Sequence, residues 1–200
     1  MTDLILASNN THKFREFSEI LLHADTNLIM QKEAGFVQEV EETGNSFAEN
    51  AFLKANAVTV YTGRPAIADD SGICVDALDG GPGIYSARFG SGIAANDEER
   101  MLLLLKTMEG KTDRHARYVC SICCTFPNGD LLRTECTCEG EILHAPVGSG
   151  GFGYDPIFRP EGFTVSMAQL SPDEKNAISH RGKALREFLK IYERYMNDHK

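Results

Sequence analysis

Two adjacent carboxylates stand at the end of a short apolar run, in the stretch Ile67-Ala68-Asp69-Asp70-Ser71-Gly72. Because side chains alternate across a strand, we expect Asp69 and Asp70 to point to opposite faces. One carboxylate can then face a cleft while the other is held by the backbone or by a basic partner. Asp, Ser and Gly also form turns, so this stretch alone favours a turn as much as a catalytic site.

A second group of residues combines aromatic rings with bare backbone. The segment from Gly148 to Pro156 places Phe152, Tyr154 and Asp155 among glycines. A planar base can stack on an aromatic ring while neighbouring backbone groups contact its edge. A bent strand in which glycine marks a bulge is the alternative interpretation.

The polar loop near the N-terminus has the composition of an anion site. Residues 4–7 are expected to form a buried strand, and residues 8–13 lead from it into a helix with apolar Phe14 and Phe17. The free N–H groups of a first helical turn and the partial positive charge there favour phosphate. Lys13 adds a mobile charge. The alternative is an ordinary N-cap made by one of the polar side chains in the loop.

Cations and further acids are placed near the expected loops and helix starts. The cations are Lys13, Lys54, Lys175, His180 and Arg181, and the acids are Glu41, Asp69 and Asp70. Together with an aromatic pocket they indicate a nucleoside phosphate bound with Mg²⁺, because magnesium needs only one or two carboxylates besides phosphate oxygens and water. For Glu39 and Glu42, the helix dipole or a solvated face is the favoured interpretation.

The elements that must position these residues follow from apolar periodicity and turn chemistry. Strands are expected at residues 4–7, 28–30, 67–75, 116–126 and 131–138, the last two joined by a turn at Pro127-Asn128-Gly129. Helices are expected to begin near residues 13, 46, 96 and 171, with a capping box of Ser46 and Glu49. An amphipathic terminal helix carries apolar residues at 185, 188, 189, 192 and 196.

Length and composition limit the class of protein. The 200 residues are 42% hydrophobic and 24% charged, which is typical of one α/β domain over residues 1–200, divided into two lobes. The net charge of -9 argues against a nucleic-acid partner. The sequence lacks an apolar run long enough for a membrane span and a basic secretory n-region, so we expect a cytoplasmic protein without a membrane partner.

The six cysteines include a pattern that resembles a zinc site, which strand geometry disfavours. Cys120 and Cys123, followed by Cys136 and Cys138, resemble a metal-binding pattern. In a strand, however, Cys120 and Cys123 face opposite sides and cannot share one ion. Buried cysteine as a small hydrophobic residue is the favoured interpretation.

Seven segments in this order resemble the inosine triphosphate pyrophosphatase family, the pyrophosphatases of non-canonical purine nucleoside triphosphates, over nearly the whole chain. The segments lie at residues 8–13, 41–44, 50–55, 68–72, 81–88, 151–156 and 179–182. The resemblance implies a mixed α/β fold with an elongated central sheet, flanking helices and two lobes around a nucleotide cleft. It also implies a homodimer that uses Mg²⁺ to hydrolyse ITP, dITP and XTP to the monophosphate and pyrophosphate.

The resemblance also assigns roles to individual residues. Glu41 and Asp70 would bind Mg²⁺, and Asp70 would also be the base for the attacking water, with Asp69 in support and Lys13 aiding catalysis. The implied substrate-binding residues are Ser8, Asn9, Asn10, Thr11, His12, Lys13, Lys54, Ser71, Phe152, Gly153, Tyr154, Asp155, Lys175, His180 and Arg181. Of these, residues 8–13 would hold the phosphates and residues 152–155 the base.

The chemistry is consistent with these roles. Water attacking the α-phosphorus needs a base and neutralisation of the leaving pyrophosphate, which Lys13 and Lys54 can supply. Two alternatives stay open at this point. A septum-inhibitor type pyrophosphatase would carry Ser followed shortly by two Arg, which this N-terminus lacks. A nucleotide sensor that binds without turnover has little need for the acid pair.

Overall fold

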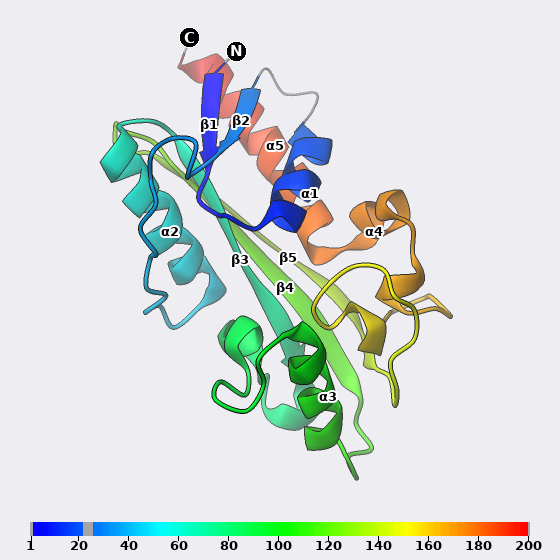
Figure 1. Ribbon diagram of the computed structural model, residues 1–200. Helices are drawn as coiled ribbons and strands as arrows, with labels where there is room; N and C mark the ends of the chain where they lie inside the picture. Colours follow the sequence, from blue (N-terminus) through cyan, green and yellow to red (C-terminus); the bar gives the residue numbers. More distant parts are fainter. Residues whose placement is uncertain (1, 22–25, 200) are drawn as a thin grey trace. The chain divides into compact units, whose positions relative to one another are not determined.

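The computed structural model describes residues 2–21 and 26–199, and within them it has the predicted mixed α/β fold (Figure 1). The strands are β1 (Thr2–Leu6), β2 (Thr26–Met30), β3 (Ala66–Val75), β4 (His115–Thr125), β5 (Leu131–Ile142) and β6 (Phe158–Pro160). The α-helices are α1 (Thr11–Leu21), α2 (Phe47–Thr62), α3 (Asp97–Thr107), α4 (Pro172–Ile178) and α5 (His180–Asp198). The described strands form one mixed sheet in the order β2-β1-β3-β4-β5-β6. Strand β1 pairs in parallel with β2 and β3, whereas β5 and β6 are antiparallel.

The chain divides into two compact units, each with its own core. The first comprises the described residues of 1–70, 120–136 and 181–200, and the second comprises residues 71–119 and 137–180. Strands β3, β4 and β5 contribute residues to both units. The prediction of one domain over residues 1–200 stays a prediction.

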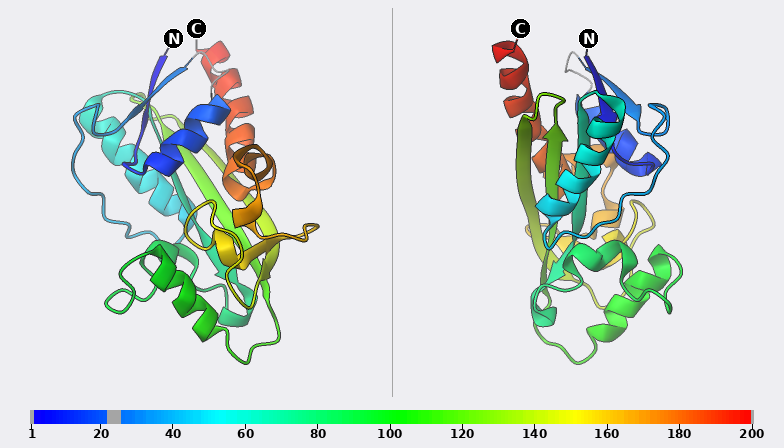
Figure 2. Two further views of the ribbon diagram at one scale, coloured as in Figure 1. Left: turned by 45° about the vertical axis from the view of Figure 1, so that its right-hand side comes forward. Right: turned by 90° about the vertical axis from the view of Figure 1, so that its left-hand side faces the viewer.

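In the first unit, helices cover both faces of the strands. Helices α1 and α5 lie side by side on one face, and α2 lies on the other (Figure 1 and Figure 2). Alternate residues of each strand enter the two cores: Leu4, Leu6 and Ile67 pack with α1 and α5, while Ile5 and Ala68 pack with α2. This is the period of two that β-strands impose.

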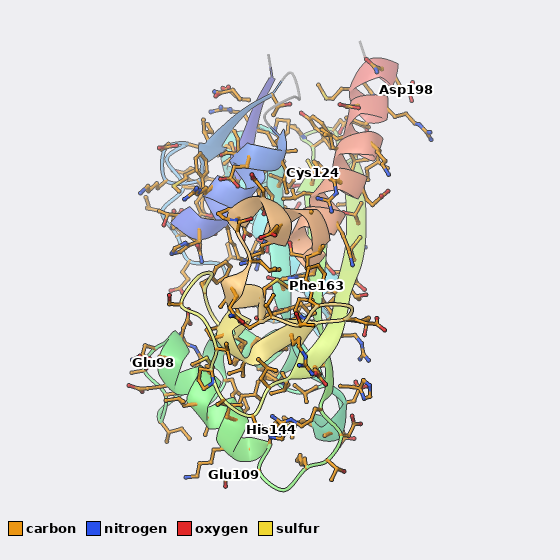
Figure 3. The ribbon with its side chains drawn as sticks, turned by 90° about the vertical axis from the view of Figure 1, so that its right-hand side faces the viewer. Glu98, Glu109, Cys124, His144, Phe163 and Asp198 are labelled. Carbon is orange, nitrogen blue, oxygen red and sulfur yellow. The ribbon has the colours of Figure 1, made fainter. Side chains whose placement is uncertain are left out.

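The cysteines follow the same alternation. Cys120 and Cys124 belong to the core beneath α1 and α5, and Cys123 belongs to the core beneath α2. Figure 3 labels Cys124 beside α5. Cys120 and Cys123 therefore lie on opposite faces of β4, as the strand geometry predicts.

Helix ends in the first unit are set by short polar side chains. The Oδ1 atom of Asn10 accepts hydrogen bonds from the backbone N–H groups of His12 (2.9 Å) and Lys13 (3.1 Å), so Asn10 caps α1. Ser46 caps α2 by accepting from the N–H of Glu49 at 3.2 Å. The predicted capping box is incomplete, because the Glu49 carboxylate accepts from Asn45 rather than from Ser46.

The second unit is built from the other halves of the long strands with α3, β6 and α4. Its core includes Tyr118, Tyr154 and Phe158. Helix α4 begins as predicted, with Pro172 in its first turn and a complete capping box between Ser171 and Glu174. Within the described part of the chain, no helix has the length and apolarity needed to cross a membrane.

Candidate functional site

Asp69 lies at the centre of a buried ion cluster in the first unit. Lys13, in the first turn of α1, places its Nζ 2.9 Å from Asp69 Oδ1. The Nε and Nη2 groups of Arg181, at the start of α5, donate to Asp69 Oδ2 at 3.1 and 3.0 Å. The Nη1 group of Arg181 donates to Glu16 at 2.6 Å. The side chains of Asp69 and Arg181 are 0% and 3% exposed, so water screens this cluster little.

This cluster holds Asp69 in the ionised form. Burial alone would raise the pKa of Asp69, but the charges of Lys13 and Arg181 outweigh it and hold the pKa well below its usual range. Burial opposes the charge on Arg181 too, yet Asp69 and Glu16 raise the pKa of the guanidinium. A carboxylate with so low a pKa is a weak proton acceptor, which makes Asp69 a support for its cations rather than a base.

Asp70 points to the opposite face and has different partners. Its Oδ1 accepts from Lys54 Nζ at 2.9 Å and its Oδ2 from Asn50 Nδ2 at 3.3 Å, both from α2. Burial raises the pKa of Asp70, Lys54 opposes this rise, and the nearby charge of Glu42 adds to it. A raised carboxyl pKa suits a general base better than the lowered pKa of Asp69. Asp69 and Asp70 therefore differ in their partners and in the direction of their pKa shifts, and their division into support and base stays a prediction.

The structure brings Glu42, rather than the predicted Glu41, beside Asp70. Glu42 lies 2.6 Å from the same Lys54 Nζ that contacts Asp70, while Glu41 is exposed. Two carboxylates therefore converge on one point, and hard oxygen donors of this kind are those that Mg²⁺ prefers. Among the described residues, no three His, Cys, Asp or Glu side chains group as a protein-only metal cage. The donor set fits an ion that completes its coordination with phosphate oxygens and water.

The loop before α1 is shaped by its own side chains. Ser8 Oγ accepts from the N–H of Asn10 at 3.1 Å, and Asn10 in turn caps the first helical turn. The N-cap alternative is therefore realised in this structure. Asn9, Asn10, Thr11 and His12 are exposed, and Ser8 and Lys13 are half-buried. A phosphate that takes the N–H groups of His12 and Lys13 must displace the Asn10 side chain.

In the second unit, Asp155 is the central hydrogen-bond acceptor of the glycine-aromatic segment, residues 148–156. Its Oδ2 accepts from Lys175 Nζ at 2.8 Å and from the backbone N–H of Phe152 at 3.0 Å, and its Oδ1 accepts from the Tyr118 hydroxyl at 3.3 Å. Asp155 is 3% exposed. Gly151 has φ +70°, and a Cβ there would lie 2.0 Å from Asp155 Oδ2, so this position requires glycine. Asp155 thus fixes the segment and orients Lys175.

The aromatic residues of this unit differ in what they offer a ligand. Lys175 Nζ lies 4.5 Å from the centre of the half-buried Phe152 ring. The Tyr154 ring is buried in the core and its hydroxyl donates to the Ser86 carbonyl at 2.8 Å, which leaves its backbone to contact a ligand. Gly153 adopts φ +61°, and Ser71, the first residue of this unit, is half-buried in β3.

Comparison with known proteins now gives the chain a family. A model of the Ham1 family matches residues 4–191. The chain belongs to the Ham1 family. A relative in Streptomyces coelicolor named dITP/XTP pyrophosphatase is 46% identical over 195 residues, which cover 96% of this chain and 97% of the relative. One with the same name in Gloeobacter violaceus is 48% identical and covers 94% of this chain and 93% of its own.

Solved structures of Ham1 proteins share the fold. A HAM1 protein from Coxiella burnetii superposes with a TM-score of 0.89 at 40% identity, covering 97% of this chain and all of that one. A Mycobacterium abscessus structure named nucleoside-triphosphatase and dITP/XTP pyrophosphatase gives a TM-score of 0.77 at 39% identity, covering 94% and 98% of the two chains. The fold and the family predicted from the sequence are both confirmed.

Several residues of these clusters were missed by sequence reasoning. Glu16 stands three positions after Lys13 on α1, so helical spacing alone would place both on one face. Glu42 is the direct neighbour of the predicted Glu41. Tyr118 lies in an apolar strand that offers no local sign of its contact with Asp155.

Proposed function

We propose that this Ham1-family chain is a nucleoside-triphosphate pyrophosphatase that hydrolyses non-canonical purine nucleoside triphosphates, dITP, XTP and ITP, to the monophosphate and pyrophosphate. The names of its relatives support the reaction and the first two substrates. One structural observation carries the proposal. Asp69 and Asp70, adjacent in β3, have separate partners: Lys13 and Arg181 hold Asp69, whereas Asp70 and Glu42 meet at Lys54 Nζ. The pKa values of the two acids are shifted in opposite directions, in keeping with a fixed anion and a proton acceptor.

In the proposed reaction, Asp70 accepts a proton from the water that attacks the α-phosphorus. Lys54 lies 2.9 Å from Asp70 and orients its carboxylate. Lys13 releases from Asp69 to neutralise charge that develops on the leaving pyrophosphate, and the loop of residues 8–13 holds the phosphates. Asp69 keeps Lys13 and Arg181 in place before the substrate arrives.

Mg²⁺ is the proposed cofactor. When bound, it would neutralise the triphosphate and lower the pKa of the attacking water. Asp70 would hold it together with a carboxylate of the Glu41–Glu42 pair. The family resemblance assigns this second ligand to Glu41, and the convergence of Glu42 and Asp70 on Lys54 Nζ favours Glu42.

The residues of the second unit are the proposed base-binding group. Phe152 offers a ring for stacking, and Lys175, His180 and the backbone N–H groups of Gly153 and Tyr154 offer donors, whereas the N–H groups of Phe152 and Asp155 bond within the segment. A keto oxygen at purine position 6 accepts hydrogen bonds, whereas adenine presents an amino donor there. Donors fixed at this place would favour deaminated purines over adenine by several orders of magnitude.

Steady-state hydrolysis tests the proposal directly. The rates are measured on ITP, dITP, XTP, GTP, ATP and modified pyrimidine triphosphates, with Mg²⁺ and with a chelator, and the products are identified. We expect monophosphate and pyrophosphate from the deaminated purines and loss of turnover with the chelator. ATP turnover comparable to that of ITP, or release of orthophosphate from the γ-position, would contradict the proposal. A preference for pyrimidine substrates would indicate the septum-inhibitor type of activity.

The assembly and location of the protein are separate proposals. We expect a homodimer in the cytoplasm, on the resemblance described above. Tyr85 is 58% exposed and lies in a segment that suits such an interface. Light scattering that gives a monomer mass at micromolar concentration would contradict the dimer.

A further inference from the structure

Tyr118, which none of the family segments includes, contacts two of the proposed base-binding residues at once. We propose that Tyr118 is a positioning residue for base recognition, which fixes the plane of the His180 ring with its own ring and the carboxylate of Asp155 with its hydroxyl. The inference rests on the proposed function, because it assigns a task within the same base-binding group. Tyr118 lies on β4, 7% exposed, within the core of the second unit.

The ring of Tyr118 is held between two others. It stacks on the His180 imidazole with the ring centres 4.5 Å apart and the planes 6° from parallel. Phe158, fully buried, meets it at 4.8 Å with a 68° tilt. Stacked and edge-on geometries are both favourable for aromatic pairs. Because the imidazole nitrogens donate and accept in the ring plane, a fixed plane fixes the direction in which His180 can contact a base.

The hydroxyl of Tyr118 links this stack to the glycine-aromatic segment. It donates to Asp155 Oδ1 at 3.3 Å, while Asp155 Oδ2 accepts hydrogen bonds from Lys175 Nζ and from the Phe152 N–H. One residue of β4 therefore connects the positions of His180, Lys175 and Phe152. Rotation of the Asp155 carboxylate would move Lys175 away from the Phe152 ring, over which it lies at 4.5 Å.

This arrangement predicts that substitutions of Tyr118 weaken recognition of the base alone. The proposed phosphate-binding residues belong to the other unit, so these substitutions should leave the affinity for a base-free polyphosphate unchanged. The Tyr118 hydroxyl bonds to a carboxylate that is ion-paired with Lys175, and loss of one hydrogen bond to a charged group weakens binding about tenfold. Loss of the ring also frees the His180 plane, and we expect a KM increase of at least about thirtyfold, because misplaced donors leave buried polar groups unpaired.

The experiment compares Tyr118→Phe, which keeps the stack and loses the hydroxyl, with Tyr118→Leu, which loses both. For each variant we measure kcat and KM on ITP, the ITP to ATP ratio of kcat/KM, and the inhibition constant of inorganic tripolyphosphate. Equilibrium binding of ITP in a chelator is measured as well. We expect a graded rise in KM and Kd from wild type to Phe to Leu, with kcat within about threefold. The tripolyphosphate constant should stay within twofold.

Two results would overturn the inference. An equal rise in the ITP and tripolyphosphate constants would show general damage rather than positioning, and an ITP KM and Kd within twofold of wild type in both variants would show no role. If Tyr118→Leu does not fold, the nearly isosteric Phe variant decides alone. A wild type that binds ITP without hydrolysing it would refute the proposed reaction while the Kd series still tests Tyr118. A wild type that binds no purine triphosphate would overturn both.

Discussion

Replacing Asp69 by asparagine removes one charge from a buried cluster and keeps its shape. The cluster holds two cations, Lys13 and Arg181, and two anions, Asp69 and Glu16. Breaking a buried ion pair by removing one partner typically costs about 3–5 kcal/mol, because the remaining charge stays buried. Since Glu16 still contacts Arg181, we expect Asp69→Asn to lower the free energy of unfolding by about 3 kcal/mol, the lower end of that range. For a chain of this length, that corresponds to a fall in Tm of roughly 6–12 °C.

The matched control is Asp70→Asn, one residue along the same strand. There two carboxylates, Asp70 and Glu42, share the ammonium group of Lys54. A raised pKa means that ionised Asp70 is less favourable in the folded chain than in the unfolded one, so its charge lowers stability once pH exceeds the unfolded value. Removing this charge should leave stability unchanged or raise it by up to about 1 kcal/mol. Hydrolysis, by contrast, should fall by about 10²–10⁴ if Asp70 is the base.

Urea unfolding at pH 7 in a chelator, followed by far-UV circular dichroism because the chain has no tryptophan, measures both variants. The midpoints are compared at constant m-value. A loss of less than about 1 kcal/mol in Asp69→Asn, or an equal destabilisation of Asp70→Asn, would contradict the stabilising role of the Asp69 cluster. Hydrolysis by Asp70→Asn within about tenfold of wild type would contradict the assignment of Asp70 as the base.

Three further pairs of variants test the Mg²⁺ ligand, the role of Asp155 and the core beneath α1 and α5. Because Glu42 lies beside Lys54 and Asp70, Glu42→Gln should raise the Mg²⁺ concentration needed for half-maximal activity by about tenfold or more. Glu41→Gln should raise it by less than about twofold. A metal titration measures both variants, and the reverse order would assign the ligand to Glu41. Gly151→Ala should raise the KM for ITP and destabilise the fold, because its Cβ would lie 2.0 Å from Asp155 Oδ2. In Gly153→Ala the new Cβ meets nothing within 4 Å, so only the left-handed backbone penalty of about 1–2 kcal/mol remains, and equal KM values in the two variants would contradict the role of Asp155. Phe188 projects from α5 into the core beneath α1 and α5, so Phe188→Ala should lower the free energy of unfolding, measured in urea, by about 3–5 kcal/mol. The control Lys190→Ala, at an exposed position of the same helix, should change it by no more than about 0.5 kcal/mol.

Element bounds are predicted well where caps and turn residues lie close in sequence, and less well where a distant strand sets them. The Ser171-Pro172 start of α4 and the hairpin between β4 and β5 follow from caps and turn residues close in sequence. Strand β5 was predicted to end at residue 138 but runs to Ile142. Residues 139–141 are Glu-Gly-Glu, which do not suggest a strand, and it is their pairing with β6 that extends it, with Gly140 opposite Pro160. That partner lies twenty positions away and contributes no local signal.

The candidate site divides in the same way. The opposite directions of Asp69 and Asp70 follow from strand geometry, and the structure has them. Their partners do not follow, because Arg181 reaches Asp69 from a helix 112 positions later in the chain. For Tyr154 the prediction from local sequence is wrong. The flanking glycines suggest a ring that is accessible to a ligand, yet the ring is packed in the core and its hydroxyl donates to the Ser86 carbonyl.

The charge balance on each face of β3 explains why adjacent acids can have different tasks. On the face of α1 and α5, two acids and two bases neutralise one another, so the Asp69 cluster has no net charge and little to gain from a further ion. On the face of α2, Asp70 and Glu42 share one lysine, so that cluster keeps one negative charge in a half-buried place. Burial makes this charge unfavourable, and a cation or a proton relieves it. The same alternation that separates the two side chains therefore puts a neutral ion cluster on one face and an uncompensated negative charge on the other, which is the face of the proposed metal ion and proton transfer.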